Sequence, residues 1–365
     1  MTEKTSEIRS PVRRKGAERY VLLSLVSFAI SVIATRTFLE LTGYPQIGNS
    51  ELHIAHVLWG GLLLFVASLL PLLLANRWAY NTSAILSGVG VGLFIDEVGK
   101  FITQSNDYFY PPAAPIIYAF FLLTVLLYIR MRRPPLRTPR AEMYRILEEI
   151  TEVLDCDLDP NERDRLEARL AKVSAETNDP NLKRLSHALY NFIEGENVRL
   201  APIAETRWQR IGAAIHPRLN QHVSQRRLKM FLVFALGGMG VLALIEFALL
   251  LIAIPAPGPW LETFLAPLIS RGELNSASLA VWFLVRTFLE GSTGILLIVS
   301  GGLILIGRER TGIHLATLVL ILWLTVINLL VFYLDQFGAV TTALFQFFIL
   351  MLLTYYRRKY LTIPR

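Results

Sequence analysis

Three ionisable residues stand inside a segment that is otherwise apolar enough for lipid. Residues 94–101 read Phe-Ile-Asp-Glu-Val-Gly-Lys-Phe, so Asp96, Glu97 and Lys100 lie where a charge is costly. Two histidines, His53 and His56, open the preceding apolar segment at a matching depth. Ionisable groups inside a membrane span are candidates for function by default. A charged side chain costs free energy in the apolar interior of a bilayer, so such residues are rare there and usually have a role.

The histidine pair raises the hypothesis of a metal site. His53 and His56 are three residues apart, so both face one side of a helix. With a carboxylate from Asp96, Glu97 or Glu40, they would form a mixed nitrogen–oxygen set that suits a divalent transition metal such as zinc, iron or manganese. The competing interpretation is preferred: a histidine near the end of a span forms a hydrogen bond at the membrane interface.

The charged residues also allow a purely structural interpretation. Arg36 with Glu40, Asp96 with Lys100, and Arg286 with Glu290 are each four residues apart, and such pairs neutralise charge within one helix. The functional interpretation treats the same groups as ligands for an ion or substrate, and both interpretations stay open. The candidate ion- or substrate-binding residues are Arg36, Glu40, Asp96, Glu97, Lys100, Asp107, Arg286, Glu290 and Asp335.

A stripe of small residues leads to the charged segment. Ala84, Gly88, Gly92, Asp96 and Lys100 follow one another at intervals of four. Small residues allow helices in a membrane to approach closely. We therefore expect this helix to be buried in the bundle, with Asp96 facing protein rather than lipid.

Composition identifies the class of protein. Of 365 residues, 53% are hydrophobic and only 18% are charged, against about 25% charged in soluble domains. The net charge of +7 does not indicate a nucleic-acid partner, because the basic residues gather at the ends of apolar segments. Cys156 is the one cysteine, so no disulfide within the chain can form and an inert thiol is expected.

Eight apolar segments are long enough to cross a bilayer as helices, which predicts an all-α integral membrane protein. No span carries a clear central break, and the first is too long for a cleaved signal peptide. The spans are predicted at residues 20–42, 52–75, 82–103, 113–130, 229–254, 278–306, 313–335 and 338–356.

Loop charges predict the orientation. The basic connections alternate with connections that hold almost no lysine or arginine, apart from Arg271. The positive-inside rule then places both termini in the cytoplasm of a cell, with the lipid bilayer as the main partner. The predicted divisions are residues 1–19 and 357–365 as cytoplasmic tails, 20–130 and 229–356 as four-helix membrane blocks, and 131–228 as a cytoplasmic insert.

The insert is predicted to be a small helical domain for protein contacts or regulation. Apolar residues recur at helical spacing from Met143 to Leu154 and from Leu182 to Phe192. Asp159, Pro160 and Glu162 predict a helix start, with Asp159 as the N-cap.

The two blocks have the same orientation, which would make an internal duplication a parallel repeat. The pattern Asp-Glu-Val-Gly after residue 95 returns as Asp-Gln-Phe-Gly after residue 334, and Arg-Thr-Phe-Leu-Glu occurs at 36–40 and 286–290. The match needs a large gap at the second motif. If the repeat is real, the second block lacks the histidines, and we expect the working site in the first block.

Three classes of function remain. Intramembrane charges and a parallel repeat favour a transporter of an ion or small solute, with a polar site that opens to the extracytoplasmic side. A metal held by His53, His56 and Asp96 would instead make a membrane hydrolase that activates water. The absence of a strong catalytic motif favours a non-catalytic scaffold, sensor or complex subunit with a protein partner at the insert.

Overall fold

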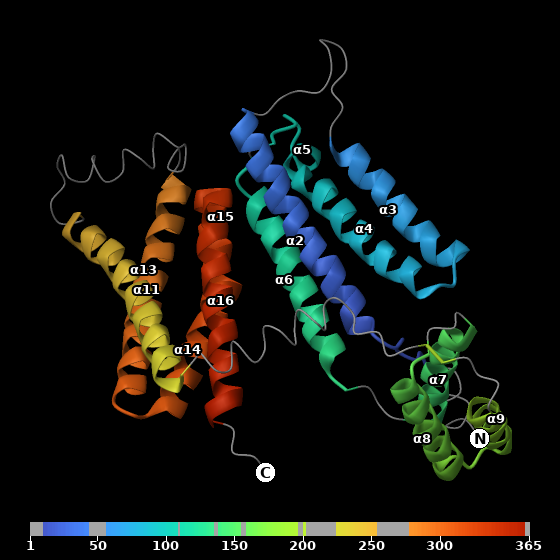
Figure 1. The fold of residues 1–365 in the computed structure, drawn as a ribbon. Helices are drawn as coiled ribbons and strands as arrows, with labels where there is room; N and C mark the ends of the chain where they lie inside the picture. Colours follow the sequence, from blue (N-terminus) through green and yellow to red (C-terminus); the bar gives the residue numbers. More distant parts are fainter. Residues whose placement is uncertain are drawn as a thin grey trace, which may run out of the picture. The chain divides into compact units, whose positions relative to one another are not determined.

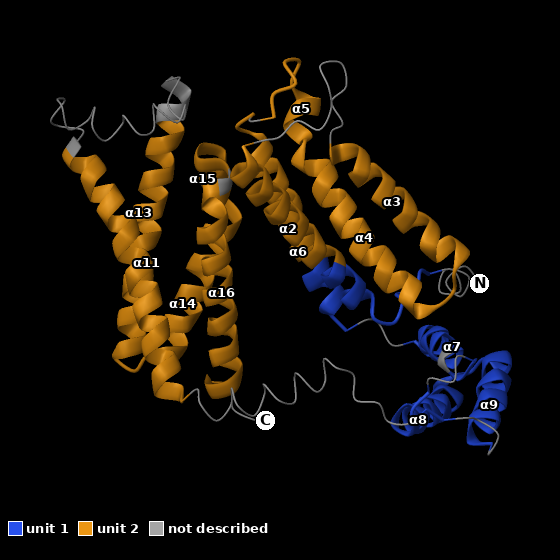
Figure 2. Cartoon of the chain, turned by 45° about the horizontal axis from the view of Figure 1, so that its top comes forward, with its two compact units in different colours: residues 1–23, 126–218 blue, residues 24–125, 219–365 orange. Residues whose placement is uncertain are grey.

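Long apolar helices account for most of the chain. The computed structural model describes residues 10–43, 56–108, 110–134, 138–154, 158–195, 200–201, 224–253 and 277–361, and no strand occurs among them. The chain divides into unit 1, residues 1–23 with 126–218, and unit 2, residues 24–125 with 219–365 (Figure 2). Each unit has its own buried apolar core.

Eight helices within the described ranges are long and apolar enough to cross a membrane (Figure 1). Each coincides with one of the eight predicted apolar segments, so the chain is an all-helical, multi-pass membrane protein. They are α2 (Ala17–Thr42), α3 (His56–Leu73), α4 (Arg77–Asp96), α6 (Ala113–Arg132), α11 (Gln225–Ala253), α13 (Ala277–Leu305), the span formed by α14 (Glu309–Leu322) and α15 (Asn328–Asp335), and α16 (Val340–Tyr356).

Unit 1 contains three helices that lie between α6 and α11 in the sequence: α7 (Pro139–Leu154), α8 (Pro160–Glu176) and α9 (Pro180–Glu194). The predicted start of α8 is confirmed. The Asp159 carboxylate accepts a hydrogen bond from the backbone N–H of Glu162, and the Glu162 side chain accepts one from the backbone N–H of Asp159. The buried core of this unit is Met143, Ile146, Leu158, Leu166, Leu170, Val173 and Ile193.

In unit 2, α4 lies against α2 on one side and α3 on the other. A Cβ atom at Gly90 would lie 2.9 Å from the backbone oxygen of Gly60 on α3, and one at Gly92 would lie 2.7 Å from the Ser31 Cβ on α2. Only residues without a side chain permit such close approach. The small-residue stripe therefore faces protein, and it places Asp96, the last residue of α4, where both neighbouring helices can reach it.

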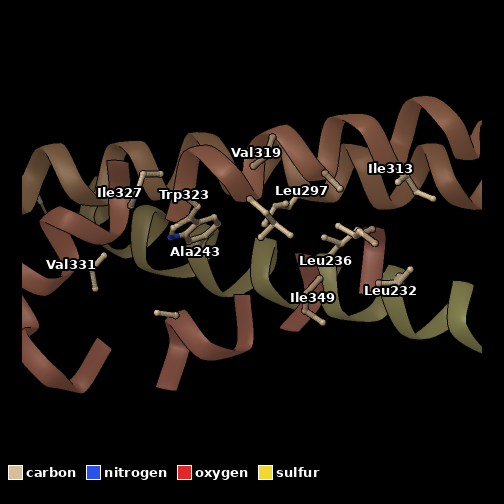
Figure 3. Close-up of a cluster of buried hydrophobic side chains, with 14 of the residues drawn as sticks. Leu232, Leu236, Ala243, Leu297, Ile313, Val319, Trp323, Ile327, Val331 and Ile349 are labelled. Carbon is tan, nitrogen blue, oxygen red and sulfur yellow. The ribbon is translucent and has the colours of Figure 1, made fainter. Parts of the chain in front are cut away.

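The second four helices have a similar glycine contact and a continuous apolar core. A Cβ atom at Gly240 of α11 would lie 2.6 Å from the backbone oxygen of Gly294 on α13. Figure 3 shows side chains of this core, including Leu236 of α11, Leu297 of α13 and Trp323 from the seventh span.

The seventh span continues as one helix from Glu309 to Asp335, as expected for an unbroken span, but its helical geometry changes near the middle. Residues Trp323–Ile327 form a π-helical stretch between α14 and α15, and the N–H of Asn328 bonds to the oxygen of Trp323. Tyr118 of α6 donates a hydrogen bond of 2.7 Å to the backbone oxygen of Leu324 in this stretch. The π-helical stretch contains neither proline nor glycine. The residues that usually signal an irregular helix therefore could not predict it from the sequence.

Candidate functional site

A network of charged side chains surrounds Asp96 at the end of α4. The Asp96 side chain is fully buried, and its Oδ1 lies 2.5 Å from the Nε of Arg36 on α2. Its Oδ2 lies 3.0 Å from His56 Nε2 on α3 and accepts a hydrogen bond of 2.7 Å from the Tyr108 hydroxyl. Three segments that are distant in sequence thus converge on one carboxylate.

Glu97 extends this network by one residue. The α4 helix ends at Asp96, and Glu97 leaves helical geometry before the short helix α5 (Val98–Ile102) begins. Its buried carboxylate lies 2.9 Å from His56 Nδ1 and 3.5 Å from Lys100 Nζ. Although Oε1 is the atom near Nδ1, no hydrogen bond of standard geometry reaches it from the described residues, so this contact is an ion pair by proximity.

The Asp96 network, defined as Arg36, His56, Asp96, Glu97, Lys100 and Tyr108, is closed by its own members. Both nitrogens of His56 face carboxylate oxygens, which is favourable only for the doubly protonated imidazolium. The guanidinium of Arg36 also lies over the Tyr108 ring, 4.1 Å from its centroid. Two carboxylates are therefore matched by three cationic groups, and each carboxylate contacts a cation on another helix.

The network replaces two of the three local pairs considered from sequence. Arg36 pairs with Asp96 across helices, while Glu40 is exposed. Lys100 contacts Glu97 rather than Asp96. Buried Asp96 is thus reached by side chains from α2 and α3.

The proposed metal ligands divide between described and undescribed parts of the chain. His53 lies outside the described residues. Within the described ranges, no three His, Cys, Asp or Glu side chains are arranged to hold a metal ion. The oxygens of Asp96 instead accept contacts from Arg36, His56 and Tyr108. Asp107 follows α5 and bonds through its backbone N–H to Thr103. The metal site stays a prediction.

A second group of polar residues lines a cavity of about 730 Å³ among the last four spans. Arg286 and Glu290 of α13 and Asp335 at the end of α15 are among the residues that sequence singled out. The remaining polar lining residues are Glu246, Asn328, Thr341, Thr342 and Gln346, and the apolar ones are Phe234, Ala235, Gly238, Met239, Leu242, Ala243, Trp323, Val331, Ala339 and Phe345. We call this space the Gln346 cavity.

The predicted pair on α13 is confirmed at one wall of this cavity. Arg286 Nε lies 3.2 Å from Glu290 Oε1, and Arg286 Nη2 lies 3.9 Å from Glu246 Oε2 on α11. Asp335 brings the lining carboxylates to three against one guanidinium. With these acids ionised, the lining carries an excess of two negative charges, whereas the Asp96 network does not carry negative excess.

Buried amides form the other polar wall. Asn328 Nδ2 donates a hydrogen bond of 2.8 Å to Gln346 Oε1 and also lies 3.4 Å from the Tyr118 hydroxyl oxygen. Gln346 is fully buried, yet its Nε2 has no hydrogen-bond partner among the described residues. An unsatisfied buried donor is costly in an apolar medium. Asn328 and Gln346 were not among the residues predicted from the sequence, because all of those were ionisable. An amide side chain inside an apolar run is itself a signal of a polar site.

Comparisons with protein-family models, with curated proteins and with solved structures found no match for this chain.

Proposed function

We propose that this protein is a membrane transporter for a small polar solute, with the Gln346 cavity as the place where the solute binds. The observation that carries the proposal is a cavity of about 730 Å³, which lies in the range of small-molecule sites. Its polar groups come from four spans that otherwise pack through apolar side chains. Transport explains why such groups are kept inside a membrane.

The seventh span supplies features that suit a transport cycle. Its π-helical stretch contributes Trp323 to the cavity and is followed directly by Asn328. At the far end of α15, Gln336 has a backbone φ of 48°, which is uncommon for a residue with a side chain. We expect the segment between these irregular points to move when the cavity changes its access from one side to the other.

The proposal retains a parallel repeat and cytoplasmic termini. In support of the repeat, α4 and α15 each end at an aspartate that is followed three residues later by glycine, Gly99 and Gly338. The Arg-Thr-Phe-Leu-Glu copies do not add support, because one lies on the first helix of its block and the other on the second helix of its block. Loop charge remains the argument for orientation.

A scaffolding role is the second candidate, and the Asp96 network favours it for the first block. Each carboxylate of this network already contacts cations of the protein, so neither carboxylate needs a cationic ligand. Under this interpretation, the network fixes α2, α3 and α4 together, and a protein partner would bind the insert. The two roles are compatible, since a transport block commonly needs a rigid block against which to move.

Uptake into reconstituted vesicles tests the transport proposal. Purified full-length protein is placed in liposomes and offered a panel of amines, carboxylates, sugars and inorganic cations, with mass spectrometry counting what enters. We expect uptake of at least one solute class above empty vesicles. Gln346→Leu should reduce that uptake by about tenfold, the equivalent of one buried hydrogen bond.

Gln104→Leu provides the matched control for this experiment. Gln104 is exposed and lies outside the cavity, so the same chemical change should leave uptake at the original rate. If no member of the panel enters faster than in empty vesicles, or if both variants behave alike, the transport proposal is wrong.

A further inference from the structure

The charge of the Gln346 cavity points to the class of molecule that it accepts. We infer that the cavity binds a small organic cation that carries an ammonium group, a hydrogen-bond acceptor and an apolar body. This inference rests on the cavity as the solute site and names its ligand class.

The acidic side of the cavity selects for positive charge. Glu290 and Glu246 flank Arg286, and Asp335 is the third lining carboxylate. With Glu246 and Glu290 ionised beside the single Arg286 guanidinium, this side of the cavity carries an excess of negative charge, which favours a cationic ligand. Glu246 has a side chain that is 56% exposed, so it can meet an entering cation, whereas Glu290 is buried. An anionic solute would instead add to the repulsion.

The amide side of the cavity requires an acceptor. The Oε1 atom of Gln346 accepts from Asn328, and this bond fixes which end of the amide is left over. That end is the Nε2 donor, which is buried and has no partner among the described residues. A hydroxyl or carbonyl oxygen on the ligand would satisfy it. A bare alkylammonium ion has no such atom, so it would satisfy the acids and leave the amide unpaired.

An inorganic ion alone would neither fill the Gln346 cavity nor contact its apolar lining. A cavity of about 730 Å³ is much larger than a single ion, since one water molecule occupies about 30 Å³ in the liquid. Phe234, Met239 and Leu242 of α11 and Trp323 of the π-helical stretch supply apolar and aromatic surface. Such surface accommodates a hydrocarbon body, and an aromatic face also favours an ammonium group.

Three probes on one carbon skeleton test the inference. The full-length protein in detergent is titrated by calorimetry with 2-amino-1-phenylethanol, with phenethylamine, which lacks the hydroxyl, and with the anion mandelate. We expect binding in the order aminoalcohol, amine, anion, with about tenfold between the first two from the single hydrogen bond. The inference is overturned if mandelate binds more strongly than the aminoalcohol, or if sodium ion competes with the aminoalcohol at equal affinity.

Two variants assign the effect to the two sides of the cavity. Gln346→Leu should remove the advantage of the aminoalcohol over the amine, while Glu246→Gln should weaken both by a similar factor. Glu246 is chosen because its exposed side chain makes misfolding less of a concern than at Glu290, and size-exclusion chromatography checks the fold of each variant. If Gln346→Leu leaves the ratio of the two affinities unchanged, the acceptor assignment is wrong.

The outcomes separate this inference from the transport proposal. Binding of the aminoalcohol without uptake into vesicles would support the ligand class and contradict transport. Uptake of a sugar or carboxylate that depends on Gln346 would support transport and contradict the ligand class.

Discussion

The Asp96 network and the Gln346 cavity use similar residues to opposite effect. In each region an aspartate ends a helix of the third span of its block, and an arginine from an Arg-Thr-Phe-Leu-Glu motif lies in the same region. Around Asp96, side chains from α2, α3 and the turn after α5 occupy the space. Around Asp335 the arginine pairs on its own helix, and a cavity remains.

The difference shows that a charged motif does not determine whether a site is open. Arg36 reaches across to Asp96 because α2 and α4 approach closely along small residues. Arg286 stays with Glu290, four residues away on α13, which leaves the lining with more acid than base. The uptake and probe-binding experiments test the Gln346 cavity. Three more test the contrast between the regions, from the largest expected effect to the smallest.

Replacement of the arginine should give the largest difference between the two regions in the free energy of unfolding. Arg36→Met leaves a fully buried Asp96 carboxylate without its closest cation, and we expect a loss of about 3 to 5 kcal/mol in the free energy of unfolding. Arg286→Met should cost less, because its acidic partners line a cavity. Thermal unfolding in detergent measures both, and equal losses would show that the regions do not differ in closure.

Glycine substitution should give a smaller effect of the same kind. At Gly99 a Cβ atom would lie 2.6 Å from the backbone oxygen of Asp107, while at Gly338 it would lie 2.8 Å from the Asp335 carboxylate oxygens. A backbone atom cannot yield as a side chain can, so Gly99→Ala should cost about 1 to 3 kcal/mol. Gly338→Ala should cost less than that and alter probe binding by moving Asp335.

Gly302→Ala is the control for these two changes, since nothing lies within 4 Å of its added Cβ atom. Unfolding and calorimetric titration are measured for all three variants. A larger loss of stability at Gly338 than at Gly99 would contradict the assignment of a rigid first site and a yielding second site.

Removal of a tyrosine hydroxyl should give the smallest effect. Tyr108→Phe deletes one hydrogen bond to the Asp96 carboxylate, and Arg36 and His56 still contact that carboxylate, so we expect a loss of about 1.5 kcal/mol, the lower end for a bond to a charged group. Tyr118→Phe deletes a bond to the backbone oxygen of Leu324, worth about 1 kcal/mol. Chemical denaturation ranks the two losses. The reverse order would mean that the π-helical turn depends on Tyr118 more than the charge network depends on Tyr108.

Much of the fold could be predicted from the sequence, because each helix is indicated by residues within its own segment. The eight spans, the small-residue stripe on α4 and the cap at Asp159 depend on neighbours within a few turns, where sequence spacing translates directly into position. The partner of Arg36 was not readable, because it depends on which helix lies against α2. The π-helical stretch at Trp323–Ile327 also lacked a local marker.

The sequence by itself determined an all-helical membrane protein and named most of the charged residues in both polar regions. Tertiary structure decided which charges meet, that Asn328 and Gln346 line the same cavity as Glu290, and that space remains beside them. The physical reason is that hydrophobicity and helix periodicity are local properties of a chain. Charge pairing and cavity volume arise only when separate helices pack, and the fit between their side chains leaves either contact or space.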